Sequence, residues 1–245
     1  MSENKTKLAK RPFMLIVRDG WGQNPNPEMD SYNAIKQAKH PYDDRLMAQY
    51  PHTLIHTSGE DVGLPVGVMG NSEVGHQNIG AGRIVDQETM RITRKIRDGS
   101  FFTNPTLLAA IAHVKAHHSK LHILGLCSDG RVHSDQTHAY AILELAKKQG
   151  LPADSVLVHI IADGRDTAPQ SGVGFFTAMQ DKINELGVGR IATVIGRYYI
   201  MDRDNRWDRV QKGYDLLTRN IGDKYVCKDG PVFRFDELGE LPAEY

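Results

Sequence analysis

The sequence predicts an α/β protein with a largely parallel sheet. Three apolar runs carry that prediction: Leu121 to Cys127, Val156 to Ile161 and Ile191 to Ile195, each of a length typical of a strand. Stretches with a helical pattern separate and follow these runs, and strands that are joined through helices pair in parallel. Ligands of such sheets gather at the carboxyl ends of the strands, so the residues after each run deserve the closest reading.

The stretch after the first run is the clearest predicted helix. Ala139, Ile142, Leu143 and Ala146 recur at the spacing that places side chains on one helical face. The other face is polar. A helix of this kind covers a sheet with its apolar side.

The beginning of the chain predicts a further strand. Phe13 to Val17 is an apolar run that leads into Arg18-Asp19-Gly20, so we expect Asp19 at a strand tip. The preceding stretch, Ser2 to Arg11, is basic and has no apolar segment, and we expect a frayed, solvated tail there.

Three more elements and a glycine-rich segment precede the sheet. Ser31 could cap a helix that continues to Lys39, Tyr42 to Gln49 predicts a second helix, and His52 to Thr57 alternates like a strand. Glycines are then frequent from Gly59 to Gly82. A change of character follows, which suggests a domain boundary near residue 83.

Composition excludes several classes of protein. With 245 residues and 40% hydrophobic content, the chain can bury a sizeable core. Lys+Arg and Asp+Glu both number 30, which removes the electrostatic argument for a nucleic-acid or membrane partner. Cys127 and Cys227 have no zinc or redox spacing, and no apolar run could cross a bilayer, so a cytoplasmic protein is expected.

Charged residues of both signs follow all three apolar runs. Arg165, Arg197 and Arg203 would together form a pocket for a small, multiply anionic ligand such as a phosphorylated hydroxy acid. His133 lies in the charged stretch after the first run and would join these arginines. The alternative is that all of these residues are ordinary solvated loop charges. Because such a stretch follows each of the three runs, this alternative is less favoured.

Ser72 is the candidate nucleophile. It follows a glycine-containing turn and precedes a stretch that could be helical, where backbone N–H groups and the helix dipole favour negative charge. An esterase elbow would need glycine in place of Val74. A plain capping serine is the commoner reading of such a pattern. The separate carboxylate of Asp19 favours the nucleophile, because a hard oxygen ligand and a serine hydroxyl suit a divalent metal.

Four motifs, taken in order, resemble cofactor-independent phosphoglycerate mutases. They are Asp19-Gly20-Trp21-Gly22, the segment Gly70 to Gly82 (Gly-Asn-Ser-Glu-Val-Gly-His-Gln-Asn-Ile-Gly-Ala-Gly), Asp163-Gly164-Arg165-Asp166 and Gly196-Arg197-Tyr198-Tyr199. The resemblance covers roughly Met14 to Arg219. It implies a partial alkaline-phosphatase-like domain over residues 1–83, followed by an inserted α/β transferase domain over residues 84–245.

The resemblance also implies roles for single residues. Ser72 would take the phosphoryl group from one glycerate hydroxyl and return it to the other, and Asp19 with Ser72 would bind one of two manganese ions. The residues that would hold 3-phosphoglycerate and 2-phosphoglycerate are His133, Arg165, Asp166, Arg197 and Arg203. Such an enzyme acts in glycolysis as a monomer and without an organic cofactor.

The chain departs from the family in three respects. It is much shorter, and the missing part would carry most metal ligands, so little or no mutase activity is expected from this chain alone. From about Asn220 the sequence no longer follows the family, as in a fragment. Arg18 replaces a commonly aliphatic residue and Arg131 a usual glycine, and both add positive charge near the expected site.

Two alternatives stay open. The first is a non-catalytic phosphoglycerate-binding module built on the transferase domain. The second, less favoured, is a metal-dependent phosphatase or a relative of phosphopentomutase, which would not require a dedicated domain to hold the acceptor.

Overall fold

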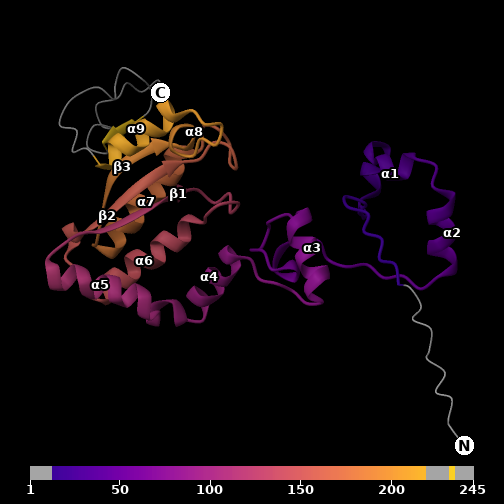
Figure 1. The fold of residues 1–245 in the computed structure, drawn as a ribbon, viewed down its shortest axis with the longest axis horizontal. Helices are drawn as coiled ribbons and strands as arrows, with labels where there is room; N and C mark the ends of the chain where they lie inside the picture. Colours follow the sequence, from indigo (N-terminus) through magenta and orange to yellow (C-terminus); the bar gives the residue numbers. More distant parts are fainter. Residues whose placement is uncertain (1–12, 219–231, 235–245) are drawn as a thin grey trace, which may run out of the picture.

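The computed structural model describes residues 13–218 and 232–234 (Figure 1). The second part of the chain contains one sheet with the strand order β1-β2-β3-β4, in which the first three strands are parallel and the last is antiparallel to its neighbour. The strands are β1 (Leu121–Cys127), β2 (Val156–Ala162), β3 (Arg190–Gly196) and β4 (Val232–Arg234). The predicted α/β class is confirmed, and each predicted run agrees with its strand to within one residue at either end.

Each of the three parallel strands is followed by a helical segment, and helices cover the sheet. The helices of this part of the chain are α4 (Glu88–Arg97), α5 (Pro105–His117), α6 (Gln136–Lys148), α7 (Gly172–Leu186), α8 (Arg197–Ile200) and α9 (Trp207–Thr218). Short 3-10 turns, η3 (Ser100–Thr103) and η4 (Ala153–Ser155), precede α5 and β2. The largest core lies between one face of the sheet and α5, α6 and α7 (Figure 1).

The predicted apolar face of α6 is confirmed by burial. Leu143 and Ala146 are fully buried in the core, and Ala139 and Ile142 pack against it while partly exposed. Removing such side chains from water is the main favourable contribution to folding of this part of the chain.

The opposite face of the sheet has a smaller core at the carboxyl ends of the strands. There Leu126, Ile161 and Ile195 pack against Leu216 of α9. Towards the amino ends the same face becomes polar: His159 Nδ1 lies 2.8 Å from Thr193 Oγ1, and its Nε2 lies 2.8 Å from His122 Nδ1. Burial lowers the pKa of His159, and the neighbouring His122 lowers it further.

The first part of the chain contains only short elements. They are η1 (Pro27–Tyr32), α1 (Ala34–Gln37), α2 (Pro41–Gln49), η2 (Gly59–Val62) and α3 (Ser72–Ala81). The second predicted helix is confirmed as α2. The prediction that Ser31 caps a helix is wrong: Ser31 lies inside η1, and Asn33 caps α1 by accepting from the backbone N–H groups of Ile35 and Lys36.

Two predicted strands, Phe13 to Val17 and His52 to Thr57, are not formed. Phe13 is 90% exposed and Ile55 is 76% exposed, and no described strand pairs with either segment. The physical reason is that a strand needs a hydrogen-bonded neighbour and an apolar face to cover, which local alternation of residue types does not provide.

The segment around α3 folds into a small unit. The side-chain amide of Asn78 donates to the carbonyl of Val62 and accepts from the N–H of Val85, and the Gln87 N–H donates to the Gly63 carbonyl at 2.8 Å. These bonds join η2 to the residues just before α4. The division of the chain at residue 83 stays a prediction.

Some predictions fall outside the described residues. These include the frayed tail from Ser2 to Arg11, Cys227, and most of the chain after Asn220. Within the described part, no helix has the length and apolar character needed to cross a bilayer.

Gly189, just before β3, should not tolerate a side chain. Its φ is +90°, and a Cβ there would lie 2.9 Å from Leu143 Cδ2 in the core. Gly150, at the end of α6, has a φ of +67° but open space around it, which makes it the matched control. We expect Gly150→Ala to lower the free energy of unfolding by about 1–2 kcal/mol through backbone strain, and Gly189→Ala by about 1–3 kcal/mol more through overpacking.

Urea denaturation of both variants measures the difference. Equal losses would mean that the core accommodates the added methyl group at residue 189, contrary to this expectation.

Candidate active site

A buried carboxylate joins the ends of the three parallel strands. Asp163 directly follows β2, and its side chain is only 1% exposed. It accepts hydrogen bonds from Ser128 Oγ at 2.6 Å, from Arg197 Nη1 at 2.7 Å and from the backbone N–H groups of Asp166 and Arg165 at 3.0 and 3.2 Å. Ser128 directly follows β1, and Arg197 directly follows β3. One side chain therefore fixes three strand tips.

Arg197 pairs with two acids at once. Its Nη1 lies 2.7 Å from Asp163 and 2.7 Å from Asp166 Oδ2, and the Arg197 and Asp166 side chains are only 11% and 12% exposed. Burial alone would raise the pKa of Asp163, but hydrogen bonds from Ser128, Asp166 N–H and Arg197 outweigh burial and lower it. Burial likewise works against the charge of Arg197, and its bonds to both acids raise its pKa. These shifts hold Asp163 and Arg197 in their charged forms.

The turn after β1 approaches this cluster closely enough to require glycine. A Cβ on Gly130 would lie 2.9 Å from Asp166 Cβ and 3.3 Å from Asp163 Oδ2. A larger residue would push the first strand tip away from the second.

The structure brings together some of the predicted ligand-binding residues. Arg197 contacts Asp166, and His133 Nε2 lies 3.9 Å from Asp166 Oδ2, with the His133 side chain 48% exposed. Arg165 and Arg203 follow β2 and α8 and are exposed, and neither forms an ion pair with another described residue. The assignment of these five residues to ligand binding stays a prediction.

Two members of the cluster, Ser128 and Asp163, were not among the predicted site residues. Both are the first residue after an apolar strand, and that position is the signal that could have found them. The sequence alone did not show that these two residues join strand ends, because that depends on which strands are neighbours in the sheet.

Arg131 links the strand tips to the segment before Ser72. Its φ is +58°, the left-handed conformation that glycine adopts without strain and that costs free energy for a residue with a Cβ. The side chain makes compensating contacts: Nε donates to Asp135 Oδ2 at 2.9 Å, and Nη1 donates to the Val66 carbonyl at 2.9 Å. Asp135 is buried and also caps α6.

Ser72 is the first residue of α3, as predicted, and its side chain is exposed. The simple capping interpretation is wrong, because Asn71 is the cap: its side chain accepts from the Val74 N–H at 3.0 Å. The Ser72 hydroxyl is therefore available for other contacts at the start of a helix.

Asp19 lies in an exposed turn, and no hydrogen bond or ion pair joins it to Ser72 or to another described residue. Its neighbour Arg18 pairs with Asp43 at 2.6 Å and lies over the Trp21 ring. Nowhere in the described ranges do three or more His, Cys, Asp or Glu side chains group closely enough to hold a metal ion. Asp19 and Ser72 offer only two oxygen ligands, so the described residues do not fit a complete metal site.

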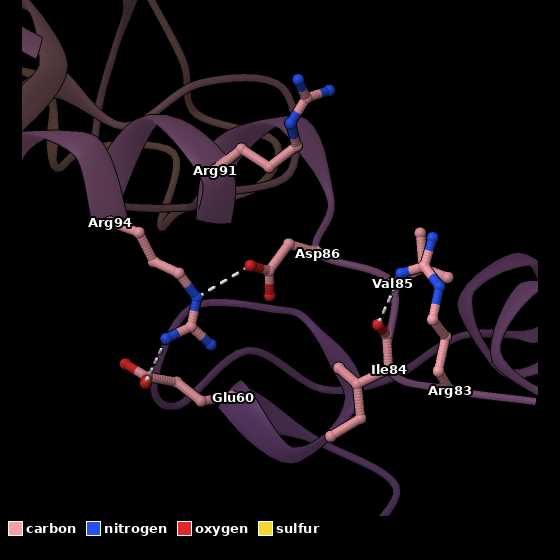
Figure 2. A pocket seen from close by; sticks show the side chains of 7 residues that line it. All are labelled: Glu60, Arg83, Ile84, Val85, Asp86, Arg91 and Arg94. Carbon is pink, nitrogen blue, oxygen red and sulfur yellow. Dashed lines mark hydrogen bonds and ion pairs between the residues drawn. The ribbon is translucent and has the colours of Figure 1, made fainter. Parts of the chain in front are cut away.

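A hollow of about 570 Å³ lies at the junction between η2 and α4, and no predicted site residue lines it (Figure 2). Arg94 crosses it, with Nε 2.8 Å from Asp86 Oδ2 and Nη1 3.7 Å from Glu60 Oε2. Glu60 also pairs with Arg97 at 2.5 Å, and the hydrogen bond from Arg97 is the main cause of its lowered pKa. The two acids that line the hollow, Glu60 and Asp86, are thus already paired with arginines. We therefore interpret the hollow as a solvated junction and not as a ligand site.

Comparison with known proteins identifies the family. Residues 92–230 match the family described as BPG-independent PGAM N-terminus. The chain belongs to this family. The 2,3-bisphosphoglycerate-independent phosphoglycerate mutase of Rhodopirellula baltica is 59% identical over 227 residues, which are 93% of this chain but 42% of that protein. The mutase of the same name from Acetivibrio thermocellus is 54% identical, over 89% of this chain and 42% of its own length.

A solved structure supports the same family assignment. A crystal structure of Leishmania mexicana phosphoglycerate mutase at low cobalt concentration superposes with a TM-score of 0.59 and 33% identity, over 81% of this chain and 37% of that one. The chain therefore spans less than half the length of these relatives. The mixed α/β fold is consistent with a phosphatase-like portion followed by a transferase portion.

Replacing Asp163 should destabilise the protein far more than replacing its serine partner. Asp163→Asn removes the buried charge that Ser128, Arg197 and two backbone N–H groups contact, and it leaves Asp166 as the one acid that still pairs with Arg197 among the described residues. Loss of one partner of a buried pair costs about 3–5 kcal/mol. Ser128→Ala removes one hydrogen bond to the same carboxylate and should cost about 1–3 kcal/mol. Thermal and urea unfolding of both variants measure these losses. Similar small losses would mean that water replaces the missing partners and that the cluster is not closed.

Proposed function

We propose that this chain supplies the substrate-holding part and the phosphoryl-accepting serine of a phosphoglycerate mutase that interconverts 3-phosphoglycerate and 2-phosphoglycerate in glycolysis. The observation that carries the proposal is the buried pairing of Arg197 with Asp163 and Asp166 at the carboxyl ends of parallel strands. Relatives at 59% and 54% identity bear the name of that enzyme.

The strand tips suit a ligand that carries a phosphate and a carboxylate. Both ion pairs of Arg197 use Nη1, so the remaining N–H groups of its guanidinium can serve a ligand. Arg165 follows β2 and Arg203 follows α8, and both are exposed and add positive charge. Because Arg197 is held before any ligand arrives, little conformational entropy is lost when the ligand binds.

Ser72 is proposed to accept the phosphoryl group. The bond between phosphorus and one glycerate oxygen breaks as the bond to Ser72 Oγ forms, and that glycerate oxygen gains the hydrogen that Ser72 Oγ loses. The reverse step delivers the group to the other glycerate hydroxyl, whose hydrogen returns to Ser72 Oγ. The backbone N–H groups at the start of α3 favour the negative charge of a phosphoryl group.

We further propose that Asp19 and Ser72 supply two oxygen ligands of a manganese site, and that other ligands come from the part of the relatives' length that this chain does not span. A related mutase was crystallised in the presence of cobalt, which favours a transition metal. When bound, such an ion would neutralise charge on the phosphoryl oxygens. No organic cofactor is proposed, nor any nucleic-acid or membrane partner, and the complete enzyme is proposed to be a cytoplasmic monomer.

A non-catalytic phosphoglycerate-binding module is the second candidate. It is favoured by one observation: the strand-tip cluster is complete within the chain, whereas the described residues offer only two metal ligands. Binding of phosphoglycerate without any dependence on manganese would support the module. A phosphatase or phosphopentomutase would be recognised by its products.

Isothermal titration of the chain with 3-phosphoglycerate tests the binding step. We expect Arg203→Met to weaken binding by roughly 10- to 100-fold, because a charge-assisted hydrogen bond is lost. Arg190→Met is the matched control, since Arg190 is also exposed but lies at the opposite, amino-terminal end of β3. If both variants weaken binding equally, general charge rather than the strand tips attracts the ligand.

A coupled mutase assay tests the chemistry. The chain is mixed with manganese and with the remaining, carboxyl-terminal part of the Rhodopirellula baltica relative, produced separately. We expect conversion of 3-phosphoglycerate that Ser72→Ala abolishes, because no other hydroxyl stands at the start of α3. The chain alone serves as the control, and activity without the added part would overturn our expectation that this chain is inactive by itself. Activity that survives Ser72→Ala would exclude the phosphoserine route.

A further inference from the structure

The ring of His76 lies against Ser72 one helical turn away. His76 Nδ1 is 3.2 Å from Ser72 Oγ and 2.8 Å from the Ser72 carbonyl oxygen. Residues four apart lie on the same face of a helix, so the geometry of α3 brings the two side chains together.

The shorter of these contacts decides where the ring carries its hydrogen. A carbonyl oxygen can only accept a hydrogen bond, so the atom that contacts it, Nδ1, must be the donor. The same N–H then also points to Ser72 Oγ, which accepts from it. The hydroxyl hydrogen of Ser72 is consequently directed elsewhere, and His76 cannot take that hydrogen at Nδ1.

We propose that His76 is a positioning residue for the Ser72 nucleophile. Its Nδ1–H holds Oγ in one rotamer and donates to the oxygen as negative charge develops there. The inference rests on the proposed function of Ser72, and it assigns His76 a role as a hydrogen-bond donor and not as a general base. A fixed donor aimed at a developing oxyanion lowers the barrier without any change in the position of the donor.

Nitrogen NMR of the labelled full chain tests the geometry directly. Long-range correlations between the ring nitrogens and ring protons report which nitrogen of His76 is protonated in the neutral form. We expect protonated Nδ1, and a change of its nitrogen shift in Ser72→Ala, where the contact to Oγ is gone. Neutral His76 with its hydrogen on Nε2 would overturn the inference. An Nδ1 chemical shift that is the same in wild type and in Ser72→Ala would also overturn it.

The two-part mutase assay tests the consequence with a matched pair of variants. The side-chain amide of asparagine places an N–H where histidine has Nδ1, whereas leucine fills similar space and has no donor. We expect His76→Leu to lower kcat by roughly 10- to 100-fold, as loss of a supporting hydrogen bond does elsewhere, with KM for 3-phosphoglycerate unchanged. His76→Asn should restore most of kcat.

Comparing His76→Leu with His76→Asn also distinguishes a positioning role of His76 from an effect on the stability of α3. Leucine is a better helix former than asparagine, so a weakened α3 would harm His76→Asn more than His76→Leu. Equal activity of wild type and His76→Leu would overturn the inference. If the wild-type mixture shows no conversion at all, the proposed function fails, and the protonated nitrogen of His76 with its response to Ser72→Ala still decides the inference.

Discussion

A carboxylate that is 1% exposed must be fully paired, and Asp163 meets that constraint with partners from three strand ends. The free energy lost on burying its charge is offset only while Ser128, Arg197 and the backbone of its own turn all stay in place. The strand tips therefore form one unit: displacing any of them exposes or orphans a charge. An arginine that is to hold an anion is best fixed in advance, and Asp163 provides that fixation for Arg197.

The two parts of the chain differ in how much they can bury on their own. The sheet encloses a continuous core with three helices on one face, and its strands are nearly continuous apolar runs, as parallel strands buried on both faces are. Before residue 58, apolar side chains such as Phe13 and Ile55 are largely exposed. The proposed metal ligand Asp19 belongs to this weakly packed part, whereas Ser72 belongs to the small unit that Asn78 closes.

How far the sequence predicts the structure follows from the same difference. β1, β2 and β3 were predicted almost to the residue, because buried parallel strands have a local signature and α6 repeats its apolar positions regularly. The strands expected at Phe13 to Val17 and His52 to Thr57 failed, because pairing needs partners that local pattern does not specify. Arg197 was named as a site residue from its position after a strand, and Asp166 only through the family resemblance, but Asp163 was not named. Only the neighbour relation of β1, β2 and β3 shows that it contacts both Ser128 and Arg197.

Among the described residues, the segment that carries Ser72 is attached to the sheet by polar contacts, and its small apolar cluster is separate from the core of the sheet. Arg131 donates to the carbonyl of Val66, and Glu60 pairs with Arg94 and Arg97 on α4. Polar contacts such as these, made by partly or fully exposed side chains, contribute little free energy each, and the ion pairs among them weaken with salt. Arg131 also holds its contact from a left-handed backbone conformation, which a glycine would adopt at lower cost. The distance between Ser72 and the strand tips is thus set by weak, solvent-exposed interactions. The geometry at the strand tips, in contrast, is set by the buried charge of Asp163, and the geometry around Ser72 is set by helix α3.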